Sequence, residues 1–199
     1  MRIGIYGGTF NPIHYGHLLL AQTALEKLAL QQVIFVPSGI PPLKGIDQLV
    51  NAQQRLHMVS LAIASNPSFS LCDFEVVRPQ KSYTIDTVHY LTKKFDDNCE
   101  FFFILGDDCA ANLHRWKGIT ELCQLLQFVQ VRRSGCNLPE QTPALLTMEM
   151  ETICVSSTLL RNCLLNHQEI DNLTPPAVVQ YIQQHALYRS VTPCTIGEQ

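Results

Sequence analysis

Six short apolar runs, separated by segments with helical spacing, constrain the fold of this chain more than any other feature. In the clearest of them, Phe101–Leu105, five consecutive apolar residues show no alternation with polar ones. Such strands are buried on both faces, which is typical of parallel sheets covered by helices. The runs that we expect as strands are Arg2–Tyr6, Val33–Val36, Phe69–Phe74, Phe101–Leu105, Phe128–Val131 and Thr152–Val155.

Three of the intervening segments carry apolar residues at helical spacing. We expect Asn66-Pro67 to end the first helix, Thr84 to N-cap the second, and Thr174-Pro175 to be the N-cap and first residue of the third. Their apolar faces comprise Leu56, Val59 and Ile63; Ile85, Val88 and Phe95; and Val178, Val179 and Ile182. The alternation of strands and helices predicts a doubly wound α/β fold, with a mainly parallel sheet and helices on both faces.

Composition narrows the class of protein. The 199 residues are 46% apolar and only 16% charged, which fits one domain with a substantial core and argues against disorder. The formal charge of −3 disfavours nucleic acid as a partner. No run approaches the ~20 apolar residues of a membrane span, and no signal peptide is visible. We therefore expect a cytoplasmic protein without membrane contact, with one domain over residues 1–189 and a loose tail over residues 190–199.

The eight cysteines form no Cys-x-x-Cys pair, so the sequence does not support a zinc ribbon or a thioredoxin-like motif. Four of them lie in apolar stretches, where a free thiol behaves as a small hydrophobic group. These four are Cys72, Cys123, Cys154 and Cys163. We expect reduced, buried thiols.

The loop after the first strand carries the strongest indication of chemistry. It reads Gly7-Gly8-Thr9-Phe10-Asn11-Pro12-Ile13-His14-Tyr15-Gly16-His17. Two glycines allow a tight turn and close approach to a ligand, and a helix starting near Gly16 would direct N–H groups to the same place, which suits phosphate. His14 and His17 can face one ligand. As metal ligands the two histidines would lack a third ligand nearby, and a capping or core role for them remains open. Contact with phosphate is the preferred hypothesis.

The string Gly-Gly-Thr-Phe-Asn-Pro-x-His-x-Gly-His closely resembles the opening signature of the HxGH nucleotidyltransferases. Further segments resemble one branch, the bacterial nicotinate-mononucleotide adenylyltransferases. These segments are Pro37–Lys44, Ser82–Thr87, Ile104–Asp108 with Trp116, Val155–Arg161 and Leu187–Arg189. The resemblance covers the chain up to Arg189. It implies a Rossmann-like fold and the reaction of ATP with nicotinate mononucleotide to give nicotinate adenine dinucleotide and pyrophosphate, a step of NAD biosynthesis.

The resemblance also implies roles for individual residues. His17 and His14 would be catalytic, with His17 at the α-phosphate. The residues it assigns to ATP binding are Gly7, Gly8, Thr9, Phe10, Ser156, Ser157, Thr158 and Arg161. The residues it assigns to the mononucleotide are Lys44, Tyr83, Thr84, Asp108 and Trp116. We expect no metal site in the protein, and Mg²⁺ to arrive with ATP.

Residue chemistry alone also allows purely structural roles for these segments. Ser156 or Ser157 can N-cap a helix that carries Arg161, which forms either a second phosphate cradle or an ordinary capped surface helix. Trp116 is either a core residue or a platform for the pyridine ring. Asp108 either grips ribose hydroxyls or caps a helix.

Three positions depart from the family pattern: Leu43 replaces a histidine, Ser134 replaces a proline, and Asp107 replaces a small residue. We expect these changes to alter substrate affinity and not the reaction. Two alternatives are the same chemistry on another acceptor, such as phosphopantetheine or a cytidylyl acceptor, and a nucleotide-binding module without catalysis. The sequence leaves open the selectivity between acid and amide mononucleotides and the oligomeric state, a homo-oligomer included.

Overall fold

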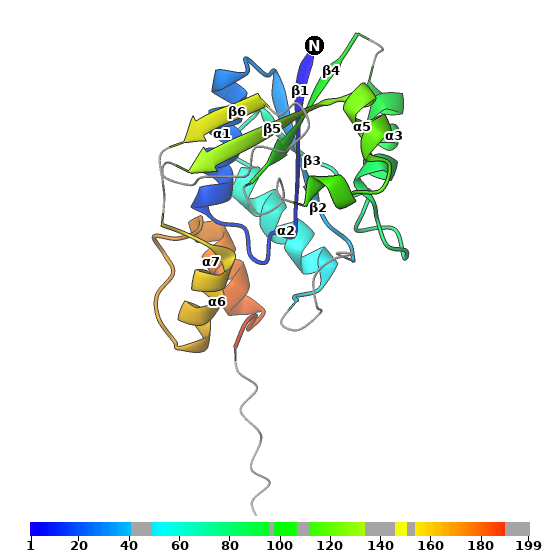
Figure 1. Ribbon diagram of the computed structural model, residues 1–199. Coiled ribbons are helices and arrows are strands. Elements are labelled where there is room, and N and C mark those ends of the chain that lie inside the picture. The colour runs from blue at the N-terminus through cyan, green and yellow to red at the C-terminus, as the bar shows by residue number, and fades with distance from the viewer. Residues whose placement is uncertain (41–48, 96–97, 107–111, 134–145, 151–153, 190–199) are drawn as a thin grey trace, which may run out of the picture.

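Six parallel strands form the central sheet of the protein (Figure 1). The computed structural model describes residues 1–40, 49–95, 98–106, 112–133, 146–150 and 154–189. The strands are β1 (Arg2–Gly8), β2 (Gln32–Pro37), β3 (Phe69–Leu71), β4 (Glu100–Leu105), β5 (Gln127–Arg133) and β6 (Leu146–Met150). Their order across the sheet is β3-β2-β1-β4-β5-β6, and every neighbouring pair is parallel.

Helices cover both faces of this sheet and enclose two separate cores (Figure 1). One core lies beneath α1 (Tyr15–Lys27), α2 (Ala52–Ile63), α6 (Ser157–Leu165) and α7 (Pro176–Gln184). The other lies beneath α3 (Thr84–Lys94), the short 3₁₀ helix η1 (Leu113–Arg115) and α5 (Ile119–Leu125). The predicted doubly wound α/β fold is confirmed.

The apolar run of β4 contributes to both cores in turn. Phe102 and Ile104 pack into the first core, whereas Phe101, Phe103 and Leu105 pack into the second. A strand covered on both faces needs an apolar residue at every position, because successive side chains point to opposite sides. This is why the run shows no alternation.

The prediction of the sixth strand is wrong in its position. The last strand is Leu146–Met150, while Cys154 and Val155 lie in no strand and residues 152–153 fall outside the described part of the chain. β6 is an edge strand in which only Met148 and Met150 are buried. Its alternating pattern gives a weak signal, since one face meets solvent.

Two predicted helix starts are each displaced by one residue. Tyr83 is the N-cap of α3, so Thr84 is the first helical residue instead of the cap. Pro175 is the N-cap of α7, which begins at Pro176. The Thr174 hydroxyl, expected to cap that helix, instead donates to the carbonyl oxygen of Ile13 at 2.8 Å. A tertiary partner has replaced the local one.

The cysteines within the described residues are all free thiols, as predicted. Cys72 is buried, but Cys123 and Cys154 are exposed, so the expectation that apolar sequence neighbours imply burial is wrong for these two. Cys123 lies on the solvent side of the short helix α5 and Cys154 lies in no helix or strand, so the neighbours' hydrophobicity does not determine their exposure. In the described segments, no helix has the length and apolar character needed to cross a membrane.

The strand order locates the place where a ligand can bind. From β1 the chain winds to one side of the sheet through β2 and β3, and then returns to β4 on the other side of β1. The helices connected to β1 and β4 therefore leave in opposite directions, which opens a crevice at the carboxyl ends of these two strands. The loop with the two histidines begins at this point.

Candidate active site

The two glycines of the loop belong to β1 and not to the turn that follows it. Gly7 and Gly8 pair with Val36 and Pro37 of β2. A Cβ on Gly7 would lie 3.0 Å from the ring of Phe103, and one on Gly8 would lie 2.8 Å from the ring of Phe10. The expectation that they form the turn is wrong, and their small size instead permits close packing.

Phe10 makes the turn itself, with a φ of 46° in the left-handed region. Its side chain is 2% exposed and packs edge-on against His17, with 5.1 Å between ring centroids. The turn therefore directs the Phe10 ring into the core, and it can offer a ligand only its backbone. This explains how Phe10 shapes the loop.

His14 and His17 hold each other at the start of α1. The Nδ1 atom of His14 accepts the His17 N–H at 3.3 Å, and the Nδ1 atom of His17 accepts the His14 N–H at 3.2 Å. Their rings stack with centroids 3.6 Å apart. His14 is thus the N-cap in a reciprocal capping box of two histidines.

This arrangement determines which ring atoms carry protons. A neutral imidazole has one donor and one acceptor nitrogen, so an accepting Nδ1 leaves the proton on Nε2. Both histidines therefore present Nε2–H as a donor. His14 is 4% exposed and His17 is only partly buried, so His17 is the more accessible of the two.

The N-terminus of α6 abuts the same loop. Ser156 N-caps α6 by accepting the Leu159 N–H at 3.1 Å. Of the two predicted caps, Ser156 and Ser157, it is therefore Ser156 that caps the helix. The Ser157 hydroxyl donates to the Pro12 carbonyl at 2.9 Å, and Arg161 Nη1 donates to the Asn11 carbonyl at 2.8 Å. Ser157 and Arg161 therefore both face the loop.

These contacts bring the two helix N-termini of α1 and α6 together at one loop. The exposed Thr158 accepts a hydrogen bond from Arg161 Nη2 at 3.3 Å. The guanidinium of Arg161 thus spans from the loop to the first turn of α6. It carries positive charge between two positive helix ends, an arrangement that attracts phosphate.

Tyr188 and Thr174 support the loop from the end of the chain. The Tyr188 hydroxyl donates to Oδ1 of Asn11 at 2.7 Å, and the same oxygen accepts the Val50 N–H at 3.3 Å. Burial raises the pKa of Tyr188, which keeps the hydroxyl protonated and able to donate. The resemblance at Leu187–Arg189 marked this segment but assigned it no role.

Arg55 is a residue of the site region that the sequence analysis missed. It is fully buried, and its guanidinium donates to the carbonyls of Thr9 at 2.8 Å, Gly39 at 2.8 Å and Val50 at 3.0 Å. Burial lowers the pKa of Arg55. The available signal was its position on the buried face of α2, three residues before Met58, where a charge is unexpected.

The resemblance assigns a second part of the site to the N-terminus of α3. In the described chain the N-cap Tyr83 makes no side-chain hydrogen bond to the helix, so no capping side chain satisfies its first N–H groups. The ammonium of Lys117 lies 4.5 Å from the centre of the Tyr83 ring, another contact that the sequence did not reveal. Trp116 is partly exposed and rests edge-on against Phe103 at 5.5 Å.

Several predicted site residues cannot be placed. Lys44 and Asp108 lie outside the described residues, as do the departures at Leu43, Asp107 and Ser134. Within the described segments no three His, Cys, Asp or Glu side chains converge as metal ligands. The described part of the site therefore offers N–H donors and cations, which are groups that bind anions.

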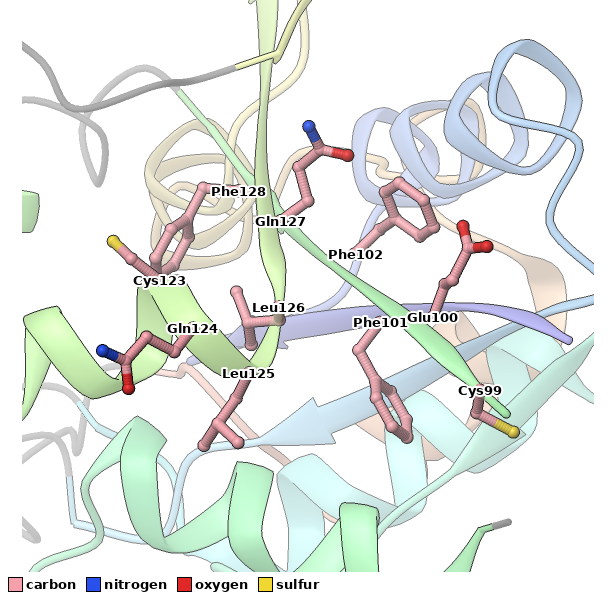
Figure 2. A pocket seen from close by; sticks show the side chains of 10 residues that line it. All are labelled: Cys99, Glu100, Phe101, Phe102, Cys123, Gln124, Leu125, Leu126, Gln127 and Phe128. Carbon is pink, nitrogen blue, oxygen red and sulfur yellow. The ribbon is translucent and has the colours of Figure 1, made fainter. Parts of the chain in front are cut away.

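An open cavity of about 600 Å³ lies at the amino ends of β4 and β5 (Figure 2). The histidine loop follows the carboxyl end of the parallel strand β1, so it lies at the opposite end of the strands. The walls of the cavity are mostly apolar, Glu100 is the one charged residue among the described residues that line it, and Cys99 and Cys123 lie at opposite ends of it (Figure 2). It brings no reactive groups together. A smaller cavity of about 250 Å³ lies beside Arg161, Tyr188 and Arg189, next to the loop.

The strand order and the histidine loop at its switch point are those of the class of Rossmann-like, nucleotide-binding α/β proteins. Residues 5–163 match the cytidylyltransferase-like family. A probable nicotinate-nucleotide adenylyltransferase of Geobacillus thermodenitrificans is 40% identical, with 96% of this chain and 88% of the relative covered. A relative of the same name in Bacillus cytotoxicus is 44% identical, with 95% and 99% covered.

Among solved structures, the Plasmodium falciparum nicotinic acid mononucleotide adenylyltransferase complexed with NaAD shares the fold. Its TM-score is 0.75 at 22% identity, with 94% of this chain and 97% of that chain covered. The chain therefore belongs to the cytidylyltransferase-like family, among the nicotinate-nucleotide adenylyltransferases.

Proposed function

We propose that the protein joins ATP and nicotinate mononucleotide to form nicotinate adenine dinucleotide and pyrophosphate. The observation that carries the proposal is the reciprocal pairing of His14 and His17 at the start of α1, against the N-terminus of α6. The names of the relatives that are 40% and 44% identical over nearly the whole chain support the same reaction.

The triphosphate binds between the N-termini of α1 and α6. The His17 Nε2–H donates to the α-phosphate and to the charge that develops on it in the transition state. The buried His14 holds the ring of His17 in place and adds a donor toward the triphosphate. Arg161 and the N–H groups of Thr9 and Ser157 neutralise the remaining phosphate oxygens.

The mononucleotide binds beside Trp116 and α3. The pyridine ring stacks on Trp116, which offers a large rigid surface at low entropy cost. The nicotinate carboxylate accepts the N–H groups of Tyr83 and Thr84, where the helix dipole favours negative charge, and Lys117 adds a positive charge nearby. Lys44 and Asp108 stay expected contacts of this substrate.

The reaction is a direct in-line displacement. An oxygen of the mononucleotide 5′-phosphate forms a bond to the α-phosphorus. The bond from that phosphorus to the oxygen that bridges the α- and β-phosphates breaks, and pyrophosphate leaves with the electron pair. The attacking phosphate is already anionic, so no general base and no covalent intermediate are needed. Catalysis then rests on positioning and charge neutralisation, and Mg²⁺ enters bound to ATP as part of that substrate.

The test is pyrophosphate release from Mg-ATP, with nicotinate mononucleotide and its nicotinamide counterpart measured in parallel. We expect release that strongly favours the acid. Equal release would refute the role of Tyr83 and Thr84, and release with neither would point to another acceptor or to a module without catalysis. With a chiral α-thio analogue of ATP, inversion at phosphorus is expected, whereas retention would contradict the in-line step.

A further inference from the structure

Gly39, in the loop after β2, is held from two sides by charged side chains that the proposed reaction does not use. Arg55 Nη2 donates to its carbonyl oxygen at 2.8 Å, and its backbone N–H favours the charged form of the Glu75 carboxyl. A Cβ on Gly39 would overlap the backbone carbonyl of Glu75, so the two backbones are in direct contact. The position of this loop is therefore closely defined.

Each of the two charged residues also reaches one half of the site. Arg55 Nη1 donates to the Thr9 carbonyl at 2.8 Å, in the loop that carries the histidines. The Thr87 hydroxyl, in the first turns of α3, donates to the Glu75 carboxyl at 2.7 Å. Hydrogen bonds thus join Thr9 to Gly39 through Arg55, and Thr87 to Glu75. The direct backbone contact between Gly39 and Glu75 connects them into one path.

Fold stability alone does not account for this path. Burying a charge is costly even when it is hydrogen-bonded, and well-packed apolar residues often stabilise a core equally well. Arg55 is nevertheless 0% exposed, and three of its nitrogens are bound to three backbone carbonyls on separate segments. What such a fork provides is fixed geometry between those segments.

We propose that Arg55 and Glu75 are positioning residues that fix the distance between the triphosphate site and the mononucleotide site. The proposal rests on the function proposed above, in which the two substrates bind at the two ends of the path. An in-line transfer depends steeply on the separation of the reacting atoms, and a displacement of ~1 Å can cost ~100-fold in rate. Each substrate still meets its own half of the site when the path is loosened, so the effect falls on kcat.

The first test is Arg55→Lys, which keeps the charge but cannot bond three carbonyls at once. We expect kcat to fall about tenfold or more, with both KM values within about threefold of the wild-type values. Arg2→Lys makes the same change at the opposite end of β1 and should leave kcat unchanged. Normal kcat in Arg55→Lys, or a loss that lies wholly in KM, would overturn the proposal.

A second pair of variants applies if Arg55→Lys does not fold. Thr87→Val removes the hydroxyl that binds Glu75, and Thr87→Ser restores it. The proposal expects a lower kcat in the valine variant and recovery in the serine variant. Where Arg55→Lys does fold, its combination with Glu75→Gln should lose less than the product of the single effects, because both act through Gly39. Independent effects, or no recovery with serine, would contradict the proposal.

A third measurement needs no turnover. In Arg55→Lys, backbone amide hydrogen exchange should speed up both in residues 9–17 and at the start of α3, and it should stay at the wild-type rate in Arg2→Lys. Unchanged exchange at α3 would contradict the linkage. If the wild-type protein released no pyrophosphate, only the proposed reaction would fail, and the exchange result would still decide whether the two segments are coupled.

Discussion

His14 and His17 each use Nδ1 to accept the backbone N–H of the other, with their rings stacked 3.6 Å apart. One pair of hydrogen bonds therefore caps α1 and fixes the tautomer of both rings. A catalytic donor usually needs a separate partner to orient it. Here the helix start performs that task, so the fold and the chemistry depend on the same atoms.

Replacement of His17 should separate these two tasks. In His17→Asn, the amide oxygen lies near the former Nδ1 position and can still accept the His14 N–H, but no donor remains at the Nε2 position. We expect kcat to fall on the order of 10²–10³-fold, as for the loss of one preorganised oxyanion donor. Thermal unfolding should change little.

His17→Ala is the companion variant, because it removes both the donor and the His17 half of the capping box. We expect a similar loss of kcat, together with a free energy of unfolding lower by about 1 kcal/mol from the lost bond to the His14 N–H. Pyrophosphate release and thermal unfolding measure the two effects. Near-wild-type turnover in either variant would exclude His17 from catalysis.

Trp116→Ala should raise KM for the mononucleotide far more than KM for ATP. The indole is partly exposed and rests on Phe103 and Phe128, so its free surface is available to the pyridine ring. Trp116→Phe keeps an aromatic surface and should recover part of the affinity. Steady-state kinetics in both substrates provide the measurement, and equal changes in the two KM values would indicate a structural tryptophan instead.

Lys117→Gln should weaken discrimination between acid and amide mononucleotides. The ammonium lies beside the N-terminus of α3, where a charge is worth 0.3–1 kcal/mol, so KM for the acid should rise about two- to fivefold while KM for the amide stays constant. Lys94→Gln removes the same charge from the last turn of α3 and is the matched control. A parallel change for both substrates would contradict a role in reading the carboxylate.

Glu75 should make stability depend on pH. Desolvation by burial raises the pKa of this carboxyl above its ordinary value of 4.5, and the Thr87 hydrogen bond offsets only part of the shift. The folded state then binds the proton more tightly than the unfolded state does. Its contribution to stability is complete below pH 4.5 and is lost as the pH rises through the folded-state pKa.

Chemical denaturation of the wild type and of Glu75→Gln from pH 4 to pH 8 measures this contribution. As the pH rises, the free energy of unfolding of the wild type should fall relative to that of Glu75→Gln. A difference that is flat across the range, or that moves the other way, would show that Glu75 titrates alike in both states.

Gly39→Ala should destabilise the fold by about 1–3 kcal/mol, since the added methyl group overlaps the Glu75 backbone and cannot move aside. Gly106→Ala is a fair comparison, because a Cβ there would meet no atom of the described residues within 4 Å. Urea unfolding of both variants tests the difference. Similar stabilities would mean that the loop at Gly39 shifts without cost.

Much of the fold was predictable because its signals are local. The apolar run at Phe101–Leu105 predicts a strand covered on both faces. The spacing of Leu56, Val59 and Ile63 predicts the buried face of α2. The edge strand β6 was misplaced because only Met148 and Met150 turn inward. A strand that meets solvent on one side has too few apolar residues to stand out.

The sequence by itself determined the fold class, the site of the histidine loop and the family, because these depend on residues close together in the chain. Only the tertiary structure decided what holds that loop. Tyr188 binds Asn11 from 177 residues away, and Arg55 binds Thr9 from 46 residues away. Such bonds leave no periodic trace in the sequence, since their partners meet only when the sheet and its helices have packed.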